Sequence, residues 1–137
     1  MYRKFLFWGT ALSGLAVILG AFAAHGLKAI IPADKIAIFE TGVRYQFMHA
    51  FALIIVSFFI QQNKSNQALI KKLSISGSLF LVGIMLFSGS LFALAIQPLI
   101  AIQYAKFIGP VTPIGGVCFV AGWFIWASAA YFNKVDN

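Results

Sequence analysis

The hydrophobic positions of this chain fall in four long stretches that contain no charged residue. They span residues 5–24, 45–63, 73–105 and 107–133. A bilayer with a hydrocarbon core of about 30 Å needs roughly 20 apolar residues in a helix that rises about 1.5 Å per residue. Each stretch is long enough to cross such a core. The pattern therefore predicts an all-α membrane protein with four transmembrane helices in an antiparallel bundle.

The composition limits what the rest of the chain can do. Hydrophobic residues make up 61% of the 137 residues and charged residues only 9%, whereas a soluble domain carries roughly 25% charge. Four spans of about 20 residues use more than half of the chain and leave no room for a catalytic domain outside the membrane. We expect a single four-helix transmembrane domain over residues 1–137, and we expect that it is not an enzyme.

The connection between the first two stretches is more apolar than an ordinary loop. Gly26 can end the first helix because glycine tolerates the left-handed conformation of a helix C-terminal cap. Pro32 can begin a new helix, and Ile36, Phe39 and Val43 then recur at helical spacing. We expect a short interfacial helical segment here that leads into the second transmembrane helix.

The net charge of +7 comes from basic residues near the ends of the apolar stretches. No basic stripe or RNA-binding aromatic pattern is present, so we expect no nucleic-acid partner. Such residues are typical of topology signals and of contacts to anionic lipid. These basic residues are modestly more numerous on one side of the membrane in the predicted topology than on the other. This difference predicts a multi-pass protein of the cell membrane with both termini in the cytoplasm. Arg3, Lys4, Lys64, Lys71, Lys72 and Lys134 then face the cytoplasm, and Lys28, Lys35, Arg44 and Lys106 face the other side.

Four segments together resemble a known family. They read LGAFAAHGLK at 19–28, FETGVRYQFMHA at 39–50, LFSGSL at 86–91 and TPIGG at 112–116, followed by AGW at 121–123. In this order and spacing they are similar to the small membrane proteins called domain of unknown function 423 (UPF0382), which include the eukaryotic transmembrane protein 256 group. The resemblance covers nearly the entire chain. It implies a four-helix membrane protein but no reaction, because no biochemical activity is established for that family.

The predicted topology brings these segments to the extracytoplasmic side of the membrane. Polar groups within a bilayer are costly unless they have partners, so polar residues gathered there are candidates for function. We therefore predict one polar pocket on this side. Its candidate residues are His25, Glu40, Thr41, Arg44, Tyr45, Gln46, His49, Ser88, Ser90 and Thr112.

Two histidines are the strongest chemical signal in this set. We expect His49 to lie about 5 to 8 Å inside the membrane boundary, at a depth that His25 can share. Two imidazoles at one level can bind a metal or haem, or relay protons. The structural alternative, which we favour, is that His25 anchors at the head groups and His49 forms hydrogen bonds. The chain has no clustered cysteines or carboxylates beside them, so we expect no metal and no cofactor.

The other candidates also allow two interpretations. Glu40 and Arg44 have the spacing of a helical ion pair, and Arg44 could instead contact a lipid phosphate. Gln46 is expected to link two helices. Ser88 to Ser90 and Gly115 with Gly116 favour close packing, or an irregular backbone that binds an ion. The expected packing glycines are Gly14, Gly20, Gly89, Gly115, Gly116 and Gly122.

Three classes of function remain open. The first is a noncatalytic membrane component that binds lipid or a membrane protein partner through the polar pocket; this fits the lack of a nucleophile with a base. The second is a small transporter or channel subunit that acts as a homo-oligomer. The third is a haem- or metal-dependent redox protein that uses His25 and His49.

Overall fold

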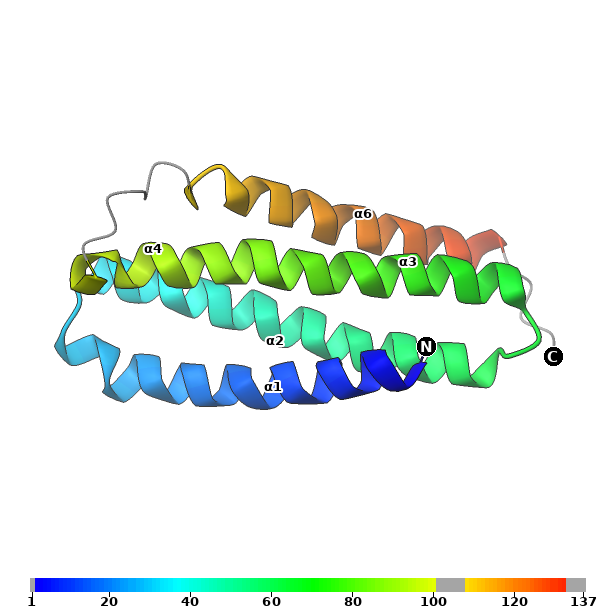
Figure 1. The fold of residues 1–137 in the computed structure, drawn as a ribbon, viewed down its shortest axis with the longest axis horizontal. Coiled ribbons are helices and arrows are strands. Elements are labelled where there is room, and N and C mark those ends of the chain that lie inside the picture. The colour runs from blue at the N-terminus through cyan, green and yellow to red at the C-terminus, as the bar shows by residue number, and fades with distance from the viewer. Residues whose placement is uncertain (1, 101–107, 133–137) are drawn as a thin grey trace.

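The structure is a computed structural model that describes residues 2–100 and 108–132. Its elements are α1 (Tyr2–His25), η1 (Leu27–Ala29), α2 (Ala33–Gln62), α3 (Gln67–Gly83), η2 (Ile84–Ser88), α4 (Gly89–Ile100) and α6 (Val111–Phe132), as Figure 1 shows. The segments α3, η2 and α4 form one continuous rod. Four helices are long and apolar enough to cross a membrane. This confirms the predicted all-α membrane fold; Lys106 and Lys134, used in the charge argument, lie outside the described residues.

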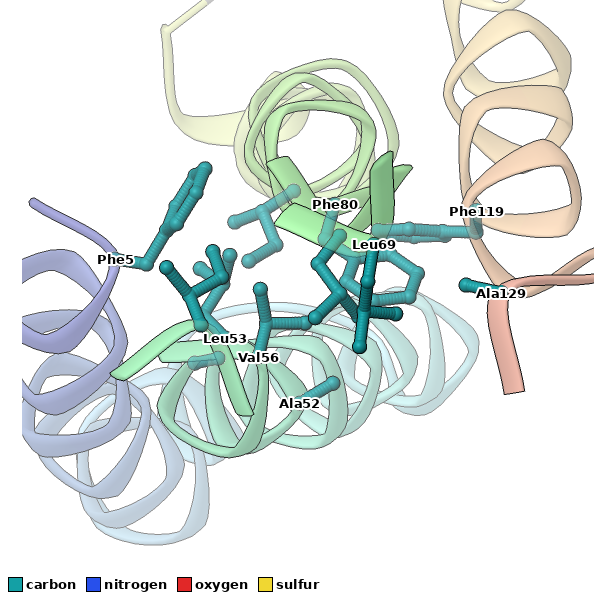
Figure 2. Close-up of a cluster of buried hydrophobic side chains, with 12 residues drawn as sticks. Phe5, Ala52, Leu53, Val56, Leu69, Phe80, Phe119 and Ala129 are labelled. Carbon is teal, nitrogen blue, oxygen red and sulfur yellow. The ribbon is translucent and has the colours of Figure 1, made fainter. Parts of the chain in front are cut away.

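The four rods run antiparallel, and each packs mainly on its neighbours in the sequence. Helix α1 packs on α2, α2 packs on α3 and α4, and α3 packs on α6. Seen along the helices, α1 and α6 lie on opposite sides of the central α2–α3 pair (Figure 2). The main hydrophobic cluster draws on all four rods, with Phe5, Leu53, Phe80 and Phe119 among its members (Figure 2).

The connection between α1 and α2 is helical, as expected, but Gly26 plays a different role. Its backbone is right-handed, with φ −83° and ψ −57°, so the predicted left-handed cap is wrong. A Cβ at this position would lie 2.7 Å from the ring of Phe22, so a larger residue there would require that exposed ring to move. After η1, Pro32 precedes the first turn of α2, which then continues for 30 residues without a break.

Four glycines on one rod lie under phenylalanine rings of another, and a fifth, Gly115, lies against the backbone of Phe87. In lipid, where apolar burial gives little drive for association, such close contacts let helices pack. A Cβ added at any of these glycines would come within 3 Å of a phenylalanine atom. The pairs are Gly77 with Phe5, Gly42 with Phe92, Gly83 with Phe119, Gly122 with Phe80 and Gly115 with Phe87.

Not every expected packing glycine has this role. Gly14 and Gly89 face open space within the described part of the chain, with no atom of another element within 4 Å of a Cβ built there, so the expectation that they pack helices is wrong. A Cβ built at Gly20 would lie 3.6 Å from the side chain of Val43, and one built at Gly116 would lie 3.7 Å from the side chain of Phe87. Both are ordinary contact distances. Four-residue spacing selects one stripe of a helix, but it does not determine which stripe faces the neighbouring helix.

The third rod contains a π-helical segment, η2, that the sequence did not predict. The N–H of Gly89 bonds to the carbonyl of Ile84, five residues earlier. Segments of this kind are rare and recur at functional sites. Here η2 brings the backbone of Phe87 against Gly115 of α6, whose added Cβ would clash with the Phe87 nitrogen and Cα. The segment therefore sets the close approach of the third and fourth rods.

Candidate functional site

His49 lies near the middle of α2 and is 3% exposed. The indole N–H of Trp123 lies 3.1 Å from its Nε2. Because an indole nitrogen can only donate, Nε2 must be the acceptor and carry no proton. The proton of the neutral ring is then on Nδ1, which donates to the carbonyl of Tyr45 at 2.8 Å. Both nitrogens are therefore engaged, and one neutral tautomer fits both bonds.

Four aromatic side chains surround this imidazole. Phe119 stacks on it, with the ring centroids 3.5 Å apart and the planes 10° apart. Phe80 lies 5.4 Å away and Tyr45 and Trp123 each 6.0 Å away, measured between centroids. We call His49 with Tyr45, Phe80, Phe119 and Trp123 the His49 box. Its walls come from α2, α3 and α6, so the box links three of the four rods.

A groove between α2 and α6 reaches the edge of the His49 box. Its volume is about 550 Å³, and its walls include Met48, Phe87, Gly116 and Val117. Val117 is 67% exposed, and Met48 is also exposed. In a protein that crosses a bilayer, these exposed apolar walls face the lipid. His49, Tyr45 and Trp123 therefore supply the polar side-chain atoms of a groove that opens sideways into hydrocarbon.

Three further predicted pocket residues form hydrogen bonds between rods. The Gln46 amide, 2% exposed, donates from α2 to the carbonyl of Leu12 on α1 at 2.9 Å. The hydroxyls of Ser90 and Thr112 lie 2.6 Å apart and join α4 to α6. Ser90 also donates to the carbonyl of Phe87 at 2.9 Å. These contacts match the structural interpretation of Gln46 and give Ser90 and Thr112 a similar role.

Ser88 differs from the other buried polar residues. It lies at the end of η2 and is 0% exposed. Its hydroxyl has no hydrogen-bond partner among the described residues. An irregular backbone beside an unpaired hydroxyl is what the ion-binding interpretation of Ser88 to Ser90 requires. A single neutral hydroxyl is a weak ligand, however, so this feature alone does not define an ion site.

The remaining predicted pocket residues lie on the outside of the helices. His25 and Thr41 each bond to a carbonyl of their own helix, at 3.1 Å and 2.8 Å. Glu40 and Arg44 are exposed, and in the described chain no ion pair joins them, so the expected pair is absent. An exposed helical pair contributes only about 0.3–0.5 kcal/mol, which is too little to hold two flexible side chains in one geometry.

The two histidines do not share a depth in the membrane. A Cβ at Gly9 would lie 2.9 Å from the carbonyl of Ala50, next to His49. His25 is sixteen residues beyond Gly9 on the same helix, which puts the imidazoles roughly 20 Å apart along the bundle. The expected common depth is wrong because α2 begins at Ala33, well before the apolar stretch. Within the described residues, no group of three metal-ligating side chains is found.

Sequence analysis missed the partners that define the box. Phe80, Phe119 and Trp123 were not among the candidates, although AGW at 121–123 belongs to a resembling segment. Phe119 and Trp123 are four residues apart and so share one face of α6. This spacing could have drawn attention to them. Nothing local, however, links Trp123 to a histidine 74 residues earlier.

Comparisons with known proteins agree with the fold. A family model described as "Protein of unknown function (DUF423)" matches residues 19–116. The chain is 36% identical over 128 residues to the UPF0382 membrane protein YwdK of Bacillus subtilis, covering 93% of this chain and 96% of that protein. It is 40% identical over 126 residues to a UPF0382 membrane protein of Haemophilus influenzae, covering 90% and 91%. No solved structure matches.

Proposed function

The chain belongs to the DUF423 family of UPF0382 membrane proteins, and from that premise we propose that it is a noncatalytic component of the cell membrane that binds lipid through the α2–α6 groove. It is an integral membrane protein with four spanning helices. The proposal adds that one domain covers residues 1–137 and that both termini lie in the cytoplasm.

The observation that carries this proposal is that buried polar groups bond within the protein. Among the described residues six polar side chains are buried, and five of these form internal hydrogen bonds. Ser57 reaches the carbonyl of Tyr2 and Ser76 that of Gly122, each on another helix. A catalytic site needs a nucleophile or base directed at a substrate. Groups committed to packing favour a structural and binding role.

The shape and chemistry of the groove favour lipid as its occupant. The groove opens towards the bilayer, and its walls are apolar and aromatic. Of its polar side chains, His49 and Trp123 are already bonded to each other, and His49 also bonds to the carbonyl of Tyr45. An acyl chain needs no hydrogen bond and can fill such a surface. A polar solute, as carried by a transporter, would need free hydrogen-bonding groups along the path.

A groove-filling substitution tests the lipid site. In Gly116→Leu the new Cβ would meet Phe87 at an ordinary 3.7 Å, so the side chain can extend into the groove without disrupting the helices. Gly14→Leu is the matched control, because that position faces open space. We expect lipid that stays bound to the purified wild type in native mass spectrometry to be lost from Gly116→Leu and retained by Gly14→Leu.

Two results would contradict the lipid proposal. Equal lipid retention by all three proteins would remove the α2–α6 groove as the site. Co-purification of a second protein, displaced by Gly116→Leu alone, would keep the groove but make a protein helix its occupant.

Cysteine labelling tests the proposed orientation. After Cys118→Ala, Ile30→Cys places a thiol in the α1–α2 connection and Ser65→Cys places one in the α2–α3 turn. With cytoplasmic termini, a membrane-impermeant maleimide should label Ile30→Cys in intact cells and Ser65→Cys only after permeabilisation. The reverse pattern would place the termini outside.

A further inference from the structure

A second groove lies between α1 and α3, at the end of the bundle where both helices begin. Its volume is about 780 Å³. Lys4 of α1 and Lys71 of α3 line its polar end, while Trp8, Ile75 and Val82 line the part that continues along the helices. It is a different surface from the α2–α6 groove, because α1 and α6 lie on opposite sides of the α2–α3 pair (Figure 2).

The charge at this end of the bundle is positive. Arg3, Lys64 and Lys72 lie near the same helix ends as the two groove lysines. The acidic residues of the described chain, Asp34 and Glu40, are at the start of α2, which is at the other end of the bundle (Figure 1). No described carboxylate is therefore available here to neutralise Lys4 and Lys71. The groove end is electrostatically complementary to an anion.

The groove changes from polar to apolar along its length. Near the lysines, Ser74 has a buried hydroxyl with no hydrogen-bond partner among the described residues. Beyond it the walls are aromatic and aliphatic apart from Ser78, whose hydroxyl donates to the carbonyl of Ser74. From Lys71 to Val82 the helix advances eleven residues, a rise of roughly 16 Å, which is close to the roughly 15 Å hydrocarbon depth of one leaflet. These dimensions suit an amphiphile with one charged end.

We propose that this groove binds one anionic glycerophospholipid. Its phosphate lies between Lys4 and Lys71, and one acyl chain follows Trp8, Ile75 and Val82. Basic pockets between transmembrane helices are suited to such head groups. A second copy of this chain in the same orientation would bring its own lysines to the same level, so like charges oppose that occupant.

Trp8 offers a local probe, because it lines the groove. Bromine atoms on an acyl chain quench nearby tryptophan fluorescence, and the signal of Trp8 is the difference between the wild type and Trp8→Phe. In vesicles at equal mole fractions, brominated phosphatidylglycerol should occupy the site about five-fold to thirty-fold better than brominated phosphatidylcholine at low salt. This range corresponds to one or two lysine contacts. Added salt should reduce the preference.

A matched pair of variants separates the groove from the general surface charge. Lys4→Gln with Lys71→Gln should reduce the Trp8 preference to about one-fold. Arg3→Gln with Lys64→Gln removes the same charge from the same end, but neither residue lines the groove, so most of the preference should remain. All four residues are exposed, and the fluorescence of Trp123 and Trp126 reports whether each variant stays folded.

Three outcomes would overturn the proposal. They are equal quenching of Trp8 by the two lipids, equal loss of preference in both double variants, and absence of Trp8 quenching by either lipid. The Gly116→Leu substitution does not touch this groove, so failure here and failure of the α2–α6 lipid site are distinguishable.

Discussion

The same residue types behave differently between the helices and on their outer surface. Between the helices, His49 and Gln46 bond to other rods and Gly115 meets another backbone. On the outer surface, His25 bonds only to its own helix and Gly14 meets nothing. Hydrocarbon offers no hydrogen bonds, so a polar group in the interior must find a protein partner. Residue type alone therefore does not identify a site in this protein; the facing helix does.

The largest difference in stability between a substitution inside the bundle and one on its outer surface is expected at the glycines. Gly115→Ala would press a Cβ against the backbone of Phe87, which cannot move without shifting η2 or α6, so we expect a loss of roughly 1–3 kcal/mol in stability. Gly14→Ala has open space and should be neutral or stabilising by up to about 1 kcal/mol, because alanine favours helix. Thermal unfolding in mild detergent measures both. Equal unfolding midpoints for Gly115→Ala and Gly14→Ala would contradict the expected difference between the two positions.

A smaller difference in stability is expected between substitutions of the two histidines. His49→Phe can keep the stack on Phe119 but loses the bond from Trp123. We expect a loss of roughly 1–2 kcal/mol, because interhelical hydrogen bonds contribute about 0.6 kcal/mol on average and an unpaired indole N–H is left behind. His25→Phe should change stability little.

A double-mutant cycle sharpens this test. Because Trp123 donates to His49, Trp123→Phe should cost less in the His49→Phe background than in the wild type, by about 0.5 kcal/mol or more. Additive costs would show that the two side chains do not interact.

The smallest difference is expected between Gln46 and Thr41. Gln46→Leu removes the bond to Leu12 on the neighbouring helix and should cost about 0.6 kcal/mol. Thr41→Val removes a bond to a carbonyl of the same helix, which already has its helical partner, and should cost nearly nothing. Unfolding midpoints measured in the same detergent show which substitution costs more stability. A larger loss of stability for Thr41→Val than for Gln46→Leu would contradict the expected order.

Much of the fold was predictable because hydrophobic length is a local property. The apolar stretches anticipated α1, α2, the third rod and α6, and the spacing of Ile36, Phe39 and Val43 anticipated the early start of helical structure before Tyr45. The π-helical turn in η2 was not predictable, because nothing in the residues 84–88 alone distinguishes it from α-helix. Its backbone packs against Gly115 on a helix distant in the sequence, and no local pattern reports such a contact.

The candidate site was predictable only in part. Tyr45, Gln46 and His49 were identified because polar and aromatic residues interrupt an apolar helix. The expected common depth of His25 and His49 was wrong because it was measured from the start of the apolar stretch, whereas α2 begins at Ala33. Trp123 and Phe119 were missed because their contact with His49 depends on how the helices rotate and pair, which one sequence does not encode locally.

The protonation state of His49 is the most direct test of the claim that the buried polar side chains of this protein serve its packing. The ¹⁵N spectrum of the imidazole in lipid, assigned by its loss in His49→Phe, separates the two neutral tautomers and the charged ring. The hydrogen bonds from Trp123 and to Tyr45 predict one neutral form with the proton on Nδ1. A proton on Nε2, or a charged ring at neutral pH, would contradict the account.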